Sequence, residues 1–286
     1  MKLGVLVSGG LGMTLLDFLS QKYNVTFVMT DRKSDAIRSF CEESDIPLFV
    51  GNPREGKSAS FIADKQIDVL VSVNYLFIIE EDLIRLPEIL AFNVHGSLLP
   101  KYRGRTPHVW AIINNEPKTG ITAHVIDEGC DTGDLLEQIE IAIDAEDTGA
   151  SILKKFEKAY PQLVDNVLSK IISKELTRTR QDHTKATWFG KRTPEDGEIN
   201  WNWYKERTVN WVRAQAYPYP GAFTWHNDTK ITIDKVIHSD MGFDQKMPNG
   251  QVIATNPLCV KTPNGVLAIL ETREDVSHLK QGDILN

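Results

Sequence analysis

Short apolar runs alternate with helical patterns through roughly the first 180 residues of the chain. The runs predict buried strands, which cover residues 3–7, 25–29, 47–50, 69–73 and 89–94. The segments between them predict helices at residues 13–19, 34–43, 58–64 and 80–86. A sustained alternation of this kind is typical of an α/β domain, so we expect a doubly wound, mostly parallel sheet.

The pattern changes after the fifth predicted strand. Apolar residues at 120–126 predict another strand, and the alternation at 135–143 predicts a half-exposed one. A helix is expected at 107–114, and a longer one at 149–174 that Thr148 can cap. Together with the earlier elements, these complete one α/β domain over residues 1–180.

The C-terminal third has a different character. Residues 177–185 are polar and charged, which is typical of a linker between domains. Five of the six tryptophans follow residue 187, together with one helical pattern at 205–215. Short β segments are expected around residues 222, 231, 252, 258 and 266. We predict a smaller β-rich domain over residues 187–286, whose tryptophans form its core or, alternatively, a surface on which a nucleotide stacks.

Composition and charge narrow the class of protein. With 41% hydrophobic and 25% charged residues, the 286-residue chain has an ordinary globular composition. The formal net charge of −7 gives no sign of a nucleic-acid surface. Because the N-terminus enters a strand directly and no apolar run could span a membrane, we expect a cytoplasmic protein. The three cysteines have no metal-like spacing, so no metal site is expected.

Two polar residues end the apolar run at 89–94. Asn93 and His95 are two positions apart, so on a strand their side chains point to the same face. An amide and an imidazolium can both donate to the oxyanion that forms when an amine attacks a carbonyl. Asp131, in the turn 127–133, is the best candidate to orient His95 and to raise its pKa.

The order and spacing of these residues resemble those of a known family. Asn93-x-His95-x-Ser97-Leu98-Leu99-Pro100 is followed by His124-x-x-x-Glu128-x-x-Asp131-x-Gly133, a pattern similar to that of the 10-formyltetrahydrofolate-dependent formyltransferases. The resemblance covers about residues 1–180. It implies a Rossmann-like formyltransferase fold, a catalytic trio of Asn93, His95 and Asp131, a folate co-substrate and no metal.

Within that family, two further stretches look most like the sugar-nucleotide N-formyltransferases, which act on dTDP- or UDP-linked amino sugars. They are Lys101-Tyr102-Arg103-Gly104-Arg105-Thr106-Pro107 and Tyr217-Pro218-Tyr219-Pro220-Gly221-Ala222-Phe223. The resemblance therefore predicts transfer of a formyl group to a nucleotide-linked amino sugar, such as a dTDP-amino-dideoxyhexose used in surface-polysaccharide (O-antigen) biosynthesis. It also predicts a homodimer.

The resemblance and the residue types together give candidate ligand contacts. For folate they are Phe77, Ile79, Leu98, Pro100 and Asp127; for Phe77 and Ile79, ordinary core packing is an equally compatible alternative. For the sugar nucleotide they are Gly10, Asn74, Tyr75, Arg103, Arg105, Tyr217 and Phe223. Gly10 belongs to a tight turn expected at 8–12, which is either structural or a phosphate contact. The guanidinium groups of Arg103 and Arg105 suit a phosphorylated ligand.

Three other functions fit the sequence less well. Formylation of methionyl-tRNA needs a basic C-terminal domain, but residues 187–286 hold 11 Lys and Arg against 12 Asp and Glu, a net charge of −1. Hydrolysis of the formyl donor is disfavoured by the large extra domain. A folate or nucleotide-sugar binding protein without activity has no need of Asn93, His95 and Asp131 together.

Overall fold

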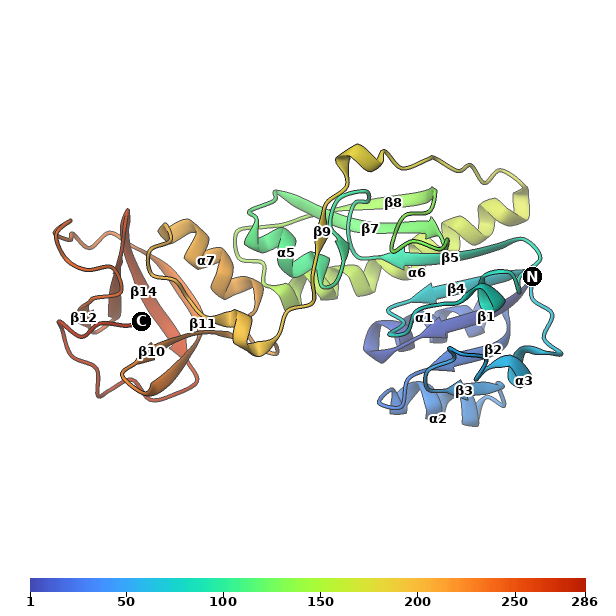
Figure 1. Cartoon of the computed structure of the whole chain (residues 1–286), viewed down its shortest axis with the longest axis horizontal. Helices are drawn as coiled ribbons and strands as arrows, with labels where there is room; N and C mark the ends of the chain where they lie inside the picture. The colour runs from blue at the N-terminus through green and yellow to red at the C-terminus, as the bar shows by residue number, and fades with distance from the viewer. The chain divides into compact units, whose positions relative to one another are not determined.

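The computed structural model describes all 286 residues, which form two compact units (Figure 1). Unit 1 contains residues 1–104, 120–141 and 155–188, and unit 2 contains residues 105–119, 142–154 and 189–286. The domain boundaries expected from the sequence stay a prediction. No helix combines the length and the apolar character needed to cross a membrane.

A seven-stranded sheet organises unit 1, in the strand order β3-β2-β1-β4-β5-β7-β8. Its strands are β1 (Lys2–Val7), β2 (Asn24–Thr30), β3 (Leu48–Val50), β4 (Val69–Val73), β5 (Leu90–His95), β7 (Lys118–Val125) and β8 (Leu135–Ala142). The strands from β3 to β5 run parallel to their neighbours, whereas β7 pairs antiparallel with β5. Strands β1 and β4 are buried on both faces, which explains their continuous apolar runs.

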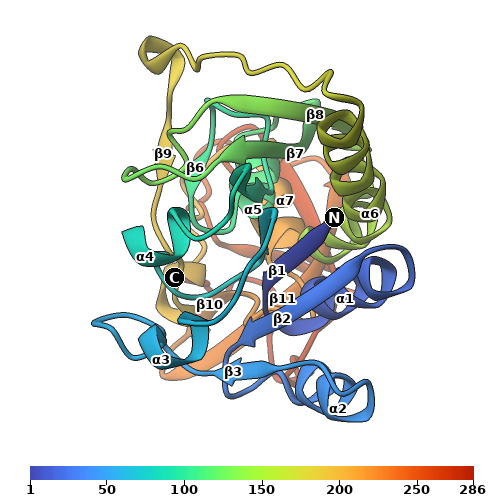
Figure 2. The same ribbon diagram turned by 90° about the vertical axis from the view of Figure 1, so that its right-hand side faces the viewer.

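Helices cover both faces of this sheet. They are α1 (Gly9–Lys22), α2 (Asp35–Glu43), α3 (Ala59–Ile62), α4 (Glu81–Ile84) and α6 (Gly149–Ser173). Figure 2 shows α1, α2 and α6 on one side of the strands, with α3 and α4 on the other. Thr148 caps α6 as predicted, because its Oγ1 accepts a hydrogen bond from the Ser151 N–H at 3.1 Å. The predicted doubly wound, mostly parallel fold is confirmed.

Helix α1 corrects one expectation, because it begins at Gly9 and leaves no separate turn over residues 8–12. Gly9 has a φ of +64°, a left-handed conformation that glycine adopts without strain and that joins β1 directly to the helix. Gly12 packs so closely on β1 that a Cβ there would lie 2.9 Å from Val7 Cβ. Two glycines therefore let the helix start at once and lie against the strand that precedes it.

The polar segment expected to be a linker is packed against unit 1. Thr179 forms a β-bridge with Leu135 at the start of β8. A 3₁₀ helix, η1 (His183–Lys185), follows, and β9 (Trp188–Phe189) then pairs with β6 (Arg103–Gly104). Backbone hydrogen bonds therefore tie the chain to β8 within this segment and to β6 directly after it, so the segment is not a free linker.

Unit 2 is built on an antiparallel sheet with the order β10-β11-β14-β13-β12. Its strands are β10 (Ala222–His226), β11 (Thr229–Ser239), β12 (Val252–Thr255), β13 (Leu258–Thr262) and β14 (Gly265–Thr272). Its helices are α5 (Pro107–Ile113), η2 (Pro194–Gly197) and α7 (Lys205–Ala214), of which α7 packs on β11 and β14. Trp201 and Trp211 are buried, so these tryptophans form core, and the predicted β-rich fold is confirmed.

Candidate active site

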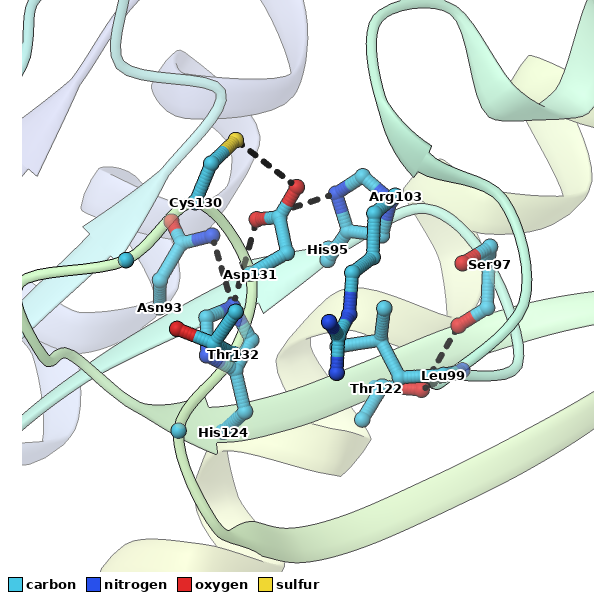
Figure 3. A network of polar contacts seen from close by, with 12 residues as sticks. Asn93, His95, Ser97, Leu99, Arg103, Thr122, His124, Cys130, Asp131 and Thr132 are labelled. Atoms are coloured by element: carbon cyan, nitrogen blue, oxygen red, sulfur yellow. Dashed lines mark hydrogen bonds and ion pairs between the residues drawn. The ribbon is translucent and has the colours of Figure 1, made fainter. Parts of the chain in front are cut away.

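Four polar side chains meet where β5 ends, and three of them are the residues singled out in the sequence (Figure 3). His95 Nδ1 lies 3.5 Å from Asp131 Oδ1, and His124 Nε2 lies 3.5 Å from the same oxygen. Asn93 Nδ2 lies 3.3 Å from His124 Nε2. Asn93 and His124 are opposite each other in the β5–β7 ladder, so strand pairing sets this contact. The sheet and the turn after β7 thus bring an amide, two imidazoles and a carboxylate together.

Asp131 is held in place by its own turn and by the chain before α5. Its φ of +56° is left-handed, a conformation that aspartate tolerates better than most residues. Its Oδ2 accepts a hydrogen bond from the Gly104 N–H at 3.0 Å. Burial raises the pKa of Asp131, but the contacts with His124, His95 and Gly104 outweigh this and leave the pKa well below its ordinary value. The residue is therefore a carboxylate at neutral pH.

His95 differs from expectation in its charge. Desolvation lowers the pKa of this buried ring below 6.5, and it outweighs the opposing effects of Asp131 and the Tyr102 carbonyl. Asp131 raises the pKa as expected, but the net shift is downward, because desolvation of the buried ring outweighs the carboxylate at 3.5 Å. His95 Nε2 donates to the Tyr102 carbonyl at 2.8 Å, since a carbonyl can only accept. This assignment leaves Nδ1 facing Asp131.

The loop after His95 is fixed by a buried hydroxyl group. Thr122 Oγ1 donates to the Ser97 carbonyl at 2.6 Å and accepts from the Leu99 N–H at 3.2 Å. Gln138 donates to the same hydroxyl at 2.8 Å and to the Leu99 carbonyl at 3.0 Å. Leu98 and Pro100, two of the predicted folate contacts, lie in this loop and are half-buried. The loop therefore holds a defined shape beside the polar cluster.

The segment that follows β4 exposes apolar side chains at different positions from those predicted. Leu76 is 46% exposed and Ile78 is 66% exposed. Phe77 and Ile79 are half-buried, and Ile79 packs on the cluster around Leu6 and Phe27. The alternative of core packing thus holds for Ile79, and its exposed neighbours are the residues that offer apolar surface.

Of the remaining candidates of unit 1, three are exposed and one packs against the core. Gly10 and Asn74 are exposed, and the Asn74 amide donates to the Ser8 carbonyl at 2.9 Å. Tyr75 packs against the core, and its buried hydroxyl has no hydrogen-bond partner. Asp127 is exposed but uses Oδ1 to accept from Gly129 N–H and Thr132 Oγ1, so one of its two oxygens serves the turn.

Arg103, predicted as a contact for the sugar nucleotide, is enclosed by the fold. It is 1% exposed, and its Nη2 donates to Gln181 Oε1 at 2.6 Å. The guanidinium also lies 5.2 Å from the centre of the Trp188 ring. Because the side chain is buried and paired with residues 181–188, it has almost no exposed surface for a ligand. Arg105, by contrast, is exposed in unit 2.

The two candidates of the aromatic stretch in unit 2 also differ in their exposure to solvent. Tyr217 is 76% exposed, and its backbone N–H is held by Asp234 at 2.9 Å. Phe223 is only 5% exposed, under Lys230, whose Nζ lies 3.8 Å from the centre of its ring. The expectation that Phe223 contacts the sugar nucleotide is therefore corrected: it is a buried residue of β10.

Gln181 belongs to this site, and nothing in the sequence singled it out. The residue lies in the polar segment taken for a linker, and its side chain contacts Arg103 and the turn that carries Asp131. No motif or periodicity marks it, since its partners are 48 to 78 residues away. His124, which the sequence offers only as part of the pattern that resembles the family, also belongs to the cluster.

The cluster can perform proton transfer and stabilise an oxyanion. It combines an anionic carboxylate, an imidazole with a lowered pKa and an amide that keeps a second N–H. No group of three or more His, Cys, Asp or Glu residues in the structure is arranged to hold a metal ion.

Comparison with known proteins matches both parts of the chain. A family model described as formyl transferase matches residues 11–168, and a second, described as formyl transferase, C-terminal domain, matches residues 191–286. The bifunctional polymyxin resistance protein ArnA from Wigglesworthia glossinidia brevipalpis is 34% identical over 229 residues, which are 80% of this chain. Those residues are 35% of the relative, so the chain spans about a third of its length.

Two solved structures share the fold. An N-formyltransferase from Helicobacter canadensis, in complex with folinic acid and dTDP-3-aminofucose, has a TM-score of 0.75 and 18% identity, over 95% of this chain and 99% of that one. WlaRD, described as a sugar 3N-formyl transferase in the presence of dTDP and 5-N-formyl-THF, has a TM-score of 0.73 and 20% identity, over 96% and 99% of the two chains. At these identities the likeness concerns the fold.

Proposed function

The chain belongs to the formyl transferase family, and we propose that it transfers a formyl group from 10-formyltetrahydrofolate to the amine of a nucleotide-linked amino sugar. One observation carries the proposal. His95 lies with one ring nitrogen on the Tyr102 carbonyl and the other toward Asp131, beside the amide of Asn93. This is the set of groups that amine attack on a formyl carbon requires.

His95 moves the proton in the proposed reaction. The amine attacks the formyl carbon with its lone pair, so it must lose a proton as the new C–N bond forms. His95 is neutral near pH 7 because its pKa is lowered by burial, and Nδ1 is the nitrogen that accepts this proton. The imidazolium that results is stabilised by Asp131 at 3.5 Å. It returns the proton to the folate nitrogen as the bond from that nitrogen to the formyl carbon breaks.

Asn93 stabilises the tetrahedral intermediate in this proposal. One N–H of its amide faces His124 Nε2, and the other is free to donate to the formyl oxygen. His124 Nδ1 donates to the Val125 carbonyl at 2.9 Å, which fixes the ring and thereby the amide. Donors of this kind contribute about 10²- to 10³-fold to the rate in comparable sites, because they are already oriented before the charge develops.

The exposed apolar surface of Leu76 and Ile78, with Leu98 and Pro100 of the loop after His95, supports a site for the folate ring system. A fused bicyclic ring system gains free energy from apolar neighbours, while polar groups at the strand ends set its orientation. Asp127 keeps one carboxylate oxygen available beside the turn. These residues are the proposed contacts for the formyl donor.

Three observations support an amino sugar as the acceptor. The relatives described above include a sugar 3N-formyl transferase and an enzyme complexed with dTDP-3-aminofucose. Residues 187–286 have a net charge of −1, which disfavours tRNA. Tyr217 is a large exposed aromatic side chain in unit 2. We therefore favour a dTDP-linked amino-dideoxyhexose, of the kind used for surface polysaccharides, with Gly10, Asn74 and Arg105 as further proposed contacts.

The test is an assay with 10-formyltetrahydrofolate and a panel of acceptors. The panel holds dTDP- and UDP-linked amino sugars, methionyl-tRNA and no acceptor, and each reaction is followed by tetrahydrofolate release and by mass spectrometry of the acceptor. We expect turnover with at least one amino sugar alone. Formylation of tRNA only, or release of tetrahydrofolate without any acceptor, contradicts the proposal. Light scattering on the same sample tests the predicted homodimer.

A further inference from the structure

The side-chain amide of Gln181 makes three hydrogen bonds, all in unit 1. Its Nε2 donates to the Asp131 carbonyl at 3.0 Å and to the Gly133 carbonyl at 2.6 Å. Its Oε1 accepts from Arg103 Nη2 at 2.6 Å. The residue is 4% exposed, so these bonds are shielded from water. Both N–H groups and the oxygen are used, which leaves one orientation of the amide.

Arg103, the partner of this amide, is itself fixed in position by its surroundings. The guanidinium is buried, lies against the Trp188 ring and also contacts His183 Nδ1 at 3.2 Å. The next residue, Gly104, donates its N–H to Asp131 Oδ2 at 3.0 Å. Residues 103 and 104 therefore hold Asp131 in two ways. Gly104 binds its carboxylate directly, and Arg103 binds Gln181, which in turn binds the Asp131 carbonyl.

The backbone at Asp131 needs such a restraint. Its left-handed φ of +56° costs a non-glycine residue about 1 kcal/mol or more and persists only where neighbours enforce it. The two carbonyl groups that Gln181 binds lie on either side of Thr132, within the same turn. Without those bonds the turn can relax, and the distances of 3.5 Å from Asp131 Oδ1 to His95 and to His124 are then no longer fixed.

We propose that Gln181 is a positioning residue for the formyl transfer, which clamps the Asp131 turn to Arg103 and so keeps the carboxylate beside His95 and His124. The inference rests on the proposed function of the site. It assigns a role in the chemistry to a segment that the sequence presents as a linker.

The substitution Gln181→Glu separates this role from a structural one. The new carboxylate keeps an acceptor for Arg103 and adds an opposite charge, so the guanidinium stays paired. It loses the two N–H donors and places an oxygen against two carbonyl oxygens, so the turn is released. We expect kcat to fall about 10- to 100-fold with KM within about threefold, because a shift near 1 Å is enough for such a loss.

A matched control is Gln66→Glu. Gln66 is an exposed glutamine of unit 1 that makes none of these contacts, so we expect its substitution to leave kcat unchanged. The melting temperature and the far-UV circular dichroism of both variants show that the fold is retained. If Gln181→Glu keeps the kcat of the unmodified protein, the inference is overturned.

A double-mutant cycle gives the second readout. If Gln181 acts through Asp131, then Gln181→Glu added to Asp131→Asn lowers kcat no further, since there is no carboxylate left to position. Losses that multiply in the double variant show instead that Gln181 acts independently of Asp131, and they refute the positioning role.

The third readout needs no activity at all. The ring signals of His95 and His124 in NMR spectra, assigned with His95→Gln and His124→Gln, report how close the carboxylate lies. We expect the signals of both rings to change in Gln181→Glu and neither to change in Gln66→Glu. Unchanged rings overturn the inference. If no acceptor is formylated, the proposed function fails. The spectra still show whether Gln181 positions Asp131 beside the two histidine rings.

Discussion

Two neighbouring strands of the same sheet end in very different surroundings. After β5, the polar side chains of His95, His124 and Asp131 are enclosed and partnered by the fold itself. After β4, Leu76 and Ile78 project into solvent. The first region has its geometry without any ligand, whereas the second offers apolar surface that the proposed folate site would cover.

The contrast implies that the first region stabilises the transition state, whereas the second contributes binding free energy to substrate and transition state alike. A preorganised polar cluster acts on groups whose charge changes during the reaction, so its loss lowers kcat. An exposed apolar segment interacts equally with bound substrate and transition state, so its loss raises KM. Each of the following predictions tests one side of this division.

The largest effect is expected for Asp131→Asn. The substitution keeps the shape of the side chain but removes the charge that stabilises protonated His95, so kcat falls about 100- to 1000-fold in the acceptor assay. Glu128→Gln, an exposed carboxylate three residues earlier in the same turn, is the control and retains activity. If the kcat of Asp131→Asn stays within about threefold of that of the unmodified enzyme, the carboxylate has no part in the mechanism.

Thr122→Val tests whether the loop after His95 depends on one hydroxyl group. The valine leaves the Ser97 carbonyl and the Leu99 N–H without their partner in a buried site. The expected loss is about 1–3 kcal/mol in the free energy of unfolding, measured by urea denaturation. The control is Thr229→Val at the exposed end of β11, where the loss stays near zero. Equal stabilities for the two variants show that the loop is held by other contacts.

Much of this arrangement is predictable from local patterns. Strands β1 to β5 follow from continuous apolar runs, and the two-residue spacing of Asn93 and His95 places both on one face of β5. The turn at 127–133 follows from its Asp and Gly content, and the partners of His95 come from its place beside that turn. These features depend on residues that are close in sequence or on regular periodicity.

The features that were not predicted depend on contacts between distant segments. The buried Arg103 is paired with Gln181, 78 residues later, and no periodicity reveals such a partner. The side chains after β4 alternate between exposed and half-buried, but the sequence alone does not say which of the two sets faces solvent; Leu76 and Ile78 are exposed in place of Phe77 and Ile79. Phe223 is a core residue of its strand despite the turn-like sequence before it.

A smaller effect is expected for the double variant Leu76→Ser/Ile78→Ser. The loss of apolar contact with the folate ring raises KM for 10-formyltetrahydrofolate about 10-fold, equivalent to about 1.4 kcal/mol, while kcat stays within about twofold. Ile172→Ser, at an equally exposed position of α6, leaves both constants unchanged. A fall in kcat with unchanged KM places these residues in the chemical step and removes the contrast between the two regions.

The smallest effect is a shift in pH dependence, and it tests the charge of His95. Because burial lowers the pKa of His95 below 6.5, the neutral base persists down to that pH and is lost as the pH falls through the lowered pKa. We therefore expect kcat at saturating substrates to be constant from about pH 8 to pH 6.5 and to decrease below that. Asp131 opposes the effect of burial, so Asp131→Asn moves this acid limb to still lower pH. The acceptor amine is common to both enzymes, so the difference between their profiles reports His95 alone. An acid limb centred above 6.5 in the unmodified enzyme, or an upward shift in Asp131→Asn, means that the carboxylate outweighs burial or does not act on His95.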